Sequence, residues 1–258
     1  GFMAVGAYVS AAVTVMALPL GAAIWRFPLA LLAGGCAAAL TGLVVAVPAF
    51  RTRGDYLAIV TLAFAMIVKS ALENIEPLGG PRGLSGIEGL STLPWVFAVT
   101  VLSVWAIRNG VYSNPGRGVL AIREDEVAAE LMGVNTRRVK IRAFMIASFF
   151  AGVAGGLFAH QLQFISPRIF DIMKTTDILV MVYLGGIGSI GGSILGASVF
   201  TVLQECLRPL GVWRMVLMPL LLVLLMLFRP RGLMGLREFA WLLPSAEFPR
   251  PSPEDPPS

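Results

Sequence analysis

Side chains able to act as nucleophiles, acids, bases or metal ligands are few in this sequence and lie far apart. His160 is the single histidine in 258 residues, and the two cysteines, Cys36 and Cys206, both lie within apolar stretches. Catalysis and metal binding both need several such groups gathered at one place. Because one histidine and scattered carboxylates do not form such a group, we expect no catalytic residue, no metal site and no cofactor.

One polar segment, 108–142, interrupts the apolar sequence and carries seven basic residues. Within it, 118–135 predicts a helix whose acidic start suits the positive end of the helix dipole and which stops at Gly133. The small residues Ala128 and Ala129 predict a face that another protein can hold in a groove. The alternative is a solvated connector whose basic residues lie on anionic lipid headgroups.

The composition of the whole chain indicates what kind of protein contains the polar segment 108–142. Hydrophobic residues make up 57% of the chain and charged residues only 14%, and the mean hydropathy is +0.80. These values exclude a disordered chain, a coiled coil and an ordinary soluble domain. The net charge of +5 comes from bases in short loops between apolar runs, which orients a membrane protein and predicts no nucleic-acid partner.

The apolar runs predict an all-α, polytopic transmembrane bundle with about eight crossings, because lipid requires every backbone polar group to be paired internally. We expect a transmembrane domain over 1–243 and a disordered, proline-rich tail over 244–258. The sequence begins with glycine and not with methionine, so we also expect that an N-terminal part is missing. The apolar runs are 1–18, 28–50, 56–72, 93–107, 143–165, 178–203 and 212–228.

The run 178–203 is too long for one upright crossing and contains a cluster of glycines. As a single helix with its flanks it would measure about 42 Å, against a hydrocarbon core of about 30 Å. Each glycine costs close to 1 kcal/mol inside a helix, so the cluster favours a break. We therefore expect two crossings, 171–187 and 190–207. The alternative is one tilted helix whose glycines permit close helix packing.

Five short motifs follow one another along the chain. They are R-T-R-G-D-Y-L-A-I-V-T-L at 51–62, G-G-P-R-G-L-S-G-I at 79–87, A-I-R-E-D-E-V-A-A-E-L-M-G at 121–133, L-G-G-I-G-S at 184–189 and F-R-P-R-G-L at 228–233. In these motifs and in their order the chain resembles the permease subunits of branched-chain amino acid ABC importers, the LivM-like family. One position departs from the E-A-A motif of such permeases. Val127 replaces the glutamate, which leaves Glu126 or Glu130 as the acidic anchor.

The resemblance implies a bacterial inner-membrane transporter for leucine, isoleucine and valine with no catalysis of its own. Its implied partners are two ABC ATPase subunits, a second, LivH-like permease subunit and an external substrate-binding protein, all acting at the lipid bilayer. The residues implied to couple the permease to the ATPases are Glu124, Asp125, Glu126, Ala128, Ala129, Glu130 and Gly133, together with Gly185, Gly186, Gly188 and Ser189 of the glycine turn.

Two other functions remain open at this point. Permeases for urea or short amides share this general pattern. An ion-coupled secondary carrier is less favoured, because such carriers need charged groups near the bilayer centre. The isolated polar residues favour structural roles: we expect Lys69 to snorkel to the outer surface, and His160 to pack or hydrogen-bond near a helix end.

Overall fold

The computed structural model describes residues 1–17, 23–50, 56–213, 216–217, 220, 223–224, 227 and 232–234. Contacts divide the chain into two compact units, Gly1–Asp171 and Ile172–Ser258, which are described separately. The motif residues 51–55, most of the run 212–228 and the predicted tail 244–258 lie outside the described residues.

The prediction of an all-α fold is confirmed for the described residues. The only strands among them, β1 (Leu84–Ser85) and β2 (Phe164–Ile165), form one short antiparallel pair. The helices of the first unit are α1 (Phe2–Ala12), which continues as a π-helical turn (Val13–Ala17), α2 (Ala23–Ala49), α3 (Tyr56–Asn74), α4 (Leu93–Val111), α5 (Asn114–Glu124), α6 (Glu126–Leu131) and α7 (Thr136–Leu162), with 3-10 turns at Glu76–Leu78, Gly80–Arg82 and Pro167–Phe170.

Three helices in the described residues are long and apolar enough to cross a membrane: Trp25–Ala49, Leu93–Val111 and Thr136–Leu162. Two further apolar helices, Phe2–Met16 and Ile190–Cys206, are shorter than a usual crossing. The membrane character of the fold therefore follows from the structure as it did from the sequence. The number of eight crossings stays a prediction.

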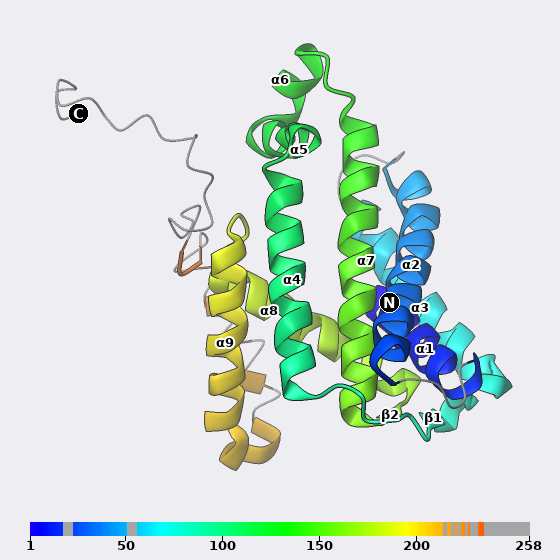
Figure 1. Cartoon of the computed structure of the whole chain (residues 1–258). Coiled ribbons are helices and arrows are strands. Elements are labelled where there is room, and N and C mark those ends of the chain that lie inside the picture. Colours follow the sequence, from blue (N-terminus) through cyan, green and yellow to red (C-terminus); the bar gives the residue numbers. More distant parts are fainter. Residues whose placement is uncertain are drawn as a thin grey trace. The chain divides into compact units, whose positions relative to one another are not determined.

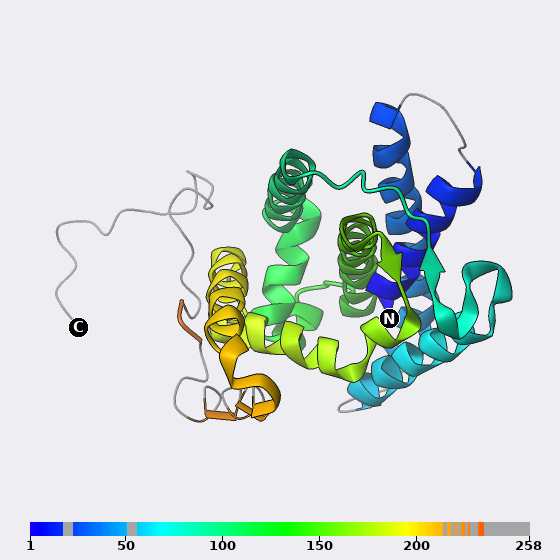
Figure 2. The same cartoon turned by 90° about the horizontal axis from the view of Figure 1, so that it is seen from below.

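Glycines bring α1, α2 and α7 together into the core of the first unit, and Figures 1 and 2 both show these three helices side by side. A Cβ atom on Gly6 of α1 would lie 2.2 Å from the Cα of Gly152 on α7. A Cβ atom on Gly152 would lie 2.7 Å from the carbonyl oxygen of Gly34 on α2. The three backbones thus touch directly, which is the contact that small residues permit between helices in lipid.

The first unit has two distinct ends. Figure 1 shows α5 and α6 at one end, beyond α4 and α7, and the β1–β2 pair at the other. Because α7 contains 27 residues, it is about 40 Å long, which is roughly 10 Å more than the hydrocarbon core. Its first two turns can therefore extend past the membrane toward α6.

The second unit confirms the predicted break in the run 178–203. Helix α8 (Ile172–Gly185) ends at the first glycine of the cluster, and α9 (Ile190–Cys206) begins within the cluster and is followed by a 3-10 segment (Arg208–Trp213). Glycines also permit close helix packing here, as the alternative interpretation predicted. A Cβ atom on Gly196 would lie 2.1 Å from the carbonyl oxygen of Met181, so α8 and α9 pack as a close antiparallel hairpin.

The end of α8 is capped by the last of the sequence motifs. The backbone N–H groups of Leu233 and Met234 donate to the carbonyl oxygens of Leu184 (2.9 Å) and Gly185 (3.1 Å). The last carbonyls of a helix have no partner within it, so this contact satisfies two of them. Leu233, the last residue of its motif, thus bonds to a motif residue nearly 50 positions earlier in the sequence.

Candidate functional site

The polar segment 108–142, which we call the docking segment, begins in the last turn of α4 (Leu93–Val111). Gly116, near the start of α5, leaves no room for a side chain, because a Cβ atom there would lie 2.2 Å from the carbonyl oxygens of Gly110 and Val111. The backbone N–H of Arg117 donates to Ser113 O over 3.0 Å. Figure 1 shows α5 nearly end-on beside the upright α4, so α5 lies across the end of that helix.

The structure corrects the prediction of one continuous helix over 118–135. The helix breaks at Asp125, which has an extended backbone (φ −156°, ψ 118°) and is the N-cap of α6. The Asp125 carboxylate accepts hydrogen bonds from the N–H groups of Val127 (2.8 Å) and Ala128 (2.9 Å). Such caps favour the start of a new helix. Of the three acidic residues at the break, Glu124 ends α5 and Glu126 begins α6.

The predicted stop at Gly133 is confirmed. Helix α6 ends at Leu131, and Gly133 has a left-handed backbone with φ 84°. Its N–H donates to Glu130 O, and the N–H of Val134 donates to Ala129 O, each over 3.0 Å. These two bonds are the Schellman pattern that ends a helix at glycine.

The structure also corrects the predicted Ala-Ala face. Ala129 is buried, with 5% of its surface exposed, whereas Ala128 is exposed. The two alanines are adjacent in sequence and so point about 100° apart around the helix, which lets one pack inward while the other faces outward. The large exposed side chains are those of Val127 (67%), Leu131 (83%) and Met132 (85%). We call Val127, Ala128, Leu131 and Met132 the α6 apolar patch.

Ionic and polar contacts hold α6 against the start of α7. Lys140 of α7 forms an ion pair with Glu126 at 2.5 Å, and the side chain of Asn135 caps α7 by accepting from Arg138 N over 3.0 Å. Glu130 is exposed and has no ion-pair partner among the described residues. Of the two candidate acidic anchors, Glu126 is therefore engaged within the chain and Glu130 faces outward.

Removing the cap of α6 is expected to loosen this helix alone. Asp125→Ala deletes both cap bonds and should destabilise α6 by about 1 kcal/mol. A helix of six residues has few other bonds, so amide exchange at 127–130 should become about fivefold faster, which hydrogen-exchange mass spectrometry measures. Glu124→Ala is the control, because the Glu124 carboxylate bonds to the Arg123 side chain. Equal exchange in the two variants would contradict the capping role.

The other predicted coupling residues lie in the second unit, at the turn between α8 and α9. Gly186 has φ 120°, a left-handed conformation that favours glycine. Ser189 is the N-cap of α9, and its hydroxyl oxygen accepts from Gly192 N over 2.8 Å. Gly185 packs so closely on α9 that a Cβ atom would lie 1.9 Å from Gly192 O. These residues, with Gly188, form a tight turn, and their part in ATPase coupling stays a prediction.

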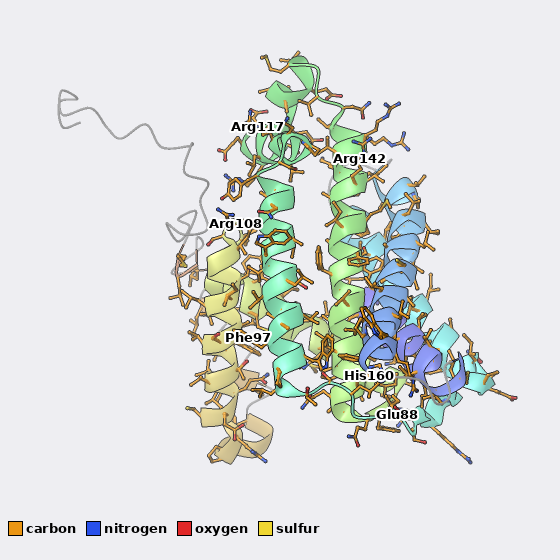
Figure 3. The ribbon with its side chains drawn as sticks, viewed as in Figure 1. Glu88, Phe97, Arg108, Arg117, Arg142 and His160 are labelled. Carbon is orange, nitrogen blue, oxygen red and sulfur yellow. The ribbon has the colours of Figure 1, made fainter. Side chains whose placement is uncertain are left out.

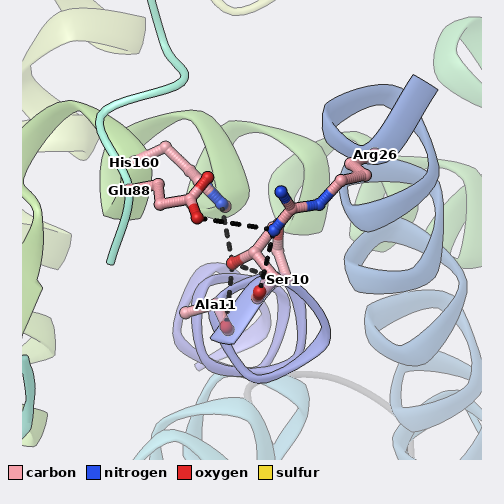
Figure 4. A network of polar contacts seen from close by, with 6 residues as sticks. Ser10, Ala11, Arg26, Glu88 and His160 are labelled. Atoms are coloured by element: carbon pink, nitrogen blue, oxygen red, sulfur yellow. Dashed lines mark hydrogen bonds and ion pairs between the residues drawn. The ribbon is translucent and has the colours of Figure 1, made fainter. Parts of the chain in front are cut away.

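A buried polar network lies at the opposite end of the first unit from α6 (Figures 3 and 4). His160 is fully buried, with Nδ1 2.7 Å from Gly156 O and Nε2 3.2 Å from the hydroxyl of Thr14. A carbonyl only accepts, so Nδ1 carries the proton and donates to it. Arg26 donates to Thr14 O over 3.3 Å and pairs with Glu88 at 3.5 Å. The predicted packing and hydrogen-bonding role of His160 is confirmed.

Lys69 has a partner that the prediction did not name. Its Nζ lies 3.3 Å from Oδ1 of Asp171, and 23% of its side chain is exposed; its extension to the outer surface stays a prediction. No sequence signal predicts this pair, since the two residues are about a hundred positions apart. Among the described residues, no group of three or more histidine, cysteine or acidic side chains could hold a metal ion.

Comparison with known proteins supplies the context for this geometry. The family described as "Branched-chain amino acid transport system / permease component" matches residues 1–228. The high-affinity branched-chain amino acid permease LivM of Escherichia coli (strain K12) is 36% identical over 91% of this chain, which spans 62% of that relative's length. LivH of Salmonella typhimurium is 33% identical over 58% of this chain and 49% of its own length.

A further relative has a lower sequence identity. The probable branched-chain amino acid permease LivM of Methanocaldococcus jannaschii is 26% identical over 75% of this chain and 64% of its own length. No solved structure matches the chain. The chain thus spans less than two thirds of the length of these curated relatives.

Proposed function

This chain belongs to the branched-chain amino acid transport system permease family, and from this premise we propose that it is a membrane-spanning subunit of an ATP-driven ABC importer. In this proposal the chain forms part of the path for leucine, isoleucine and valine across the inner membrane. Separate subunits bind and hydrolyse ATP. The end of the first unit that carries α5 and α6 faces the cytoplasm, because the bases of 108–142 gather there and positive residues favour the inner side.

The observation that carries the proposal is the α6 apolar patch. Large apolar side chains exposed on a membrane-spanning helix face lipid, but α6 lies beyond the ends of α4 and α7 (Figure 1). Leu131 and Met132 are more than four fifths exposed there. An exposed apolar patch rimmed by polar residues marks a protein interaction site, and Glu130 provides part of the rim.

The way in which α6 is held supports its use as a coupling element. Only a contact that differs between two states can change their equilibrium. Helix α6 is tied to the long helix α7 by the Glu126–Lys140 pair and follows α5 directly at Asp125, its N-cap residue. A partner that moves α6 would therefore move the end of α7, and α7 runs through the glycine-packed core of the unit.

The remaining partners follow from the relatives. Both LivM and LivH, two permeases of branched-chain amino acid systems by name, resemble this chain. We infer that it pairs with a second, LivH-like permease subunit, engages two ATPase subunits and receives its amino acid from an external binding protein. The names of the relatives favour amino acids over urea or short amides as the cargo.

Cysteine crosslinking tests the proposed contact. In a variant whose exposed Cys36 and Cys206 are replaced by serine, Leu131→Cys should crosslink to an ATPase subunit in the assembled transporter. Arg82→Cys is the control, since Arg82 is exposed and lies two residues before β1, which Figure 1 shows at the opposite end of the first unit. The crosslink should also change in yield when ATP is bound, because the contact transmits a conformational change.

Two results would contradict the proposal. If Leu131→Cys captures no ATPase while Arg82→Cys does, the orientation and the contact are both wrong. If purified vesicles accumulate leucine without ATP but with an ion gradient, the chain is an ion-coupled carrier instead.

A further inference from the structure

The first two turns of α7 carry a cluster of basic residues, most of which have no ion-pair partner among the described residues. The residues 136–142 include Arg137, Arg138, Lys140 and Arg142. Lys140 pairs with Glu126 of α6. The three arginines are exposed and have no ion-pair partner among the described residues. An explanation is needed for three unpaired arginines so close together.

The helix period places two of these arginines on one face, away from α6. Arg138 and Arg142 are four residues apart, so their side chains are neighbours on the helix surface. Lys140, two residues from each, points toward the opposite side, where it meets α6. Two like charges at this spacing repel each other, and a bound anion between them removes the repulsion.

The depth of the two arginines identifies the kind of anion. Helix α7 exceeds the hydrocarbon core by about 10 Å, or roughly seven residues, and the apolar sequence resumes at Ala143. Arg142 is therefore at the edge of the hydrocarbon and Arg138 one turn beyond it. This is the level of the lipid phosphates, not the level of the α6 apolar patch.

Neighbouring elements add positive charge at the same level. Arg117 of α5 is exposed and also lacks an ion-pair partner among the described residues. Helix α5 packs against α7, because a Cβ atom on Gly118 would lie 3.4 Å from the Val139 side chain. Figure 3 shows Arg117, Arg142 and Arg108 of α4 at one end of the unit, with Glu88 and His160 toward the other.

We propose that Arg138 and Arg142 bind the phosphate of an anionic phospholipid in the cytoplasmic leaflet, with Arg117 adding to the attraction. A guanidinium group matches phosphate through two parallel N–H···O bonds. The segment 108–142 then has two separate surfaces: an apolar and acidic one on α6 for a protein, and a basic one on α7 and α5 for lipid. The bound lipid fixes the height of α7 in the membrane.

Lipid titration of the purified permease complex tests this site without ATP or amino acid. Phosphatidylglycerol is added to complex in phosphatidylcholine nanodiscs, and bound lipid is counted by native mass spectrometry. Each base near an anionic surface contributes about fivefold, so the double variant Arg138→Gln, Arg142→Gln should bind phosphatidylglycerol about 25-fold more weakly. Added salt should weaken binding by the original protein.

The matched control removes the same charge at the other end of the unit. Arg82 and Arg168 are exposed and flank the β1–β2 pair, and Arg82→Gln, Arg168→Gln should leave phosphatidylglycerol binding unchanged. Equal binding by both double variants would overturn the site. So would a loss of ATPase subunits from the Arg138→Gln, Arg142→Gln complex with lipid binding intact, because the arginines would then belong to the protein contact. Neither outcome depends on which amino acid is transported.

Discussion

Gly6→Ala should prevent the first unit from packing, although it adds only one methyl group. The new Cβ atom would lie 2.2 Å from the Cα of Gly152 and 2.3 Å from its carbonyl oxygen. These are backbone atoms in the middle of α7, so no side chain can rotate to make room. Overpacking of a tight core costs about 1–3 kcal/mol when the neighbours can shift. Here α1 must move away from α7, and we expect a loss at the upper end of that range or above it.

The same substitution at another helical glycine provides the control. Gly110 lies in α4, and a Cβ atom there would meet nothing within 4 Å. Gly110→Ala should be neutral or stabilise the protein by up to about 1 kcal/mol, since alanine favours a helix more than glycine does. Thermal unfolding in detergent compares the two variants. If Gly6→Ala melts at the same temperature as Gly110→Ala, the three-helix contact at Gly152 is not the core of this unit.

The sequence predicts the all-α fold and the break between α8 and α9, because a backbone in lipid must pair its own polar groups. Apolar runs of the right length must be helices, and the glycine cluster at 185–192 predicted a break because each glycine destabilises a helix interior. The same sequence does not show which glycines pack against a neighbouring helix and which allow the chain to turn. Gly186 turns the chain, whereas Gly196 packs on Met181, and that difference depends on how α8 and α9 meet.

The sequence predicted the position of the docking segment, but not the helix break within it or which of its side chains are buried. The polarity of the segment and the helix stop at Gly133 are local sequence signals. The helix break at Asp125 has no such signal, because an acidic residue inside a helical pattern is usually part of the helix. Its capping bonds to Val127 and Ala128 identify it as a boundary. The burial of Ala129 could not be predicted either, since it depends on how α6 packs against the neighbouring helices α5 and α7.

Ala128→Arg is expected to abolish coupled transport while leaving the permease folded. Ala128 is exposed, so the longer side chain extends into solvent and displaces no part of the core. It lies beside Leu131 in the α6 apolar patch, where a partner that fits apolar and acidic groups would meet a bulky cation. Centrally placed contact residues contribute about 2 kcal/mol or more to an interface, which is about thirtyfold in binding. Amino acid uptake by reconstituted vesicles should fall by at least tenfold.

A matched variant separates a lost contact from a general effect of charge. Asn114→Arg adds the same cation to the exposed first residue of α5, outside the α6 apolar patch, and should leave uptake within twofold of the original. Thermal unfolding of both variants should match the original protein. Normal uptake by Ala128→Arg would remove α6 as the coupling element, even though the chain still belongs to a permease family. Uptake lost equally in both variants would place the sensitivity in the charge of the whole segment, and the contact would then extend over α5 as well as α6.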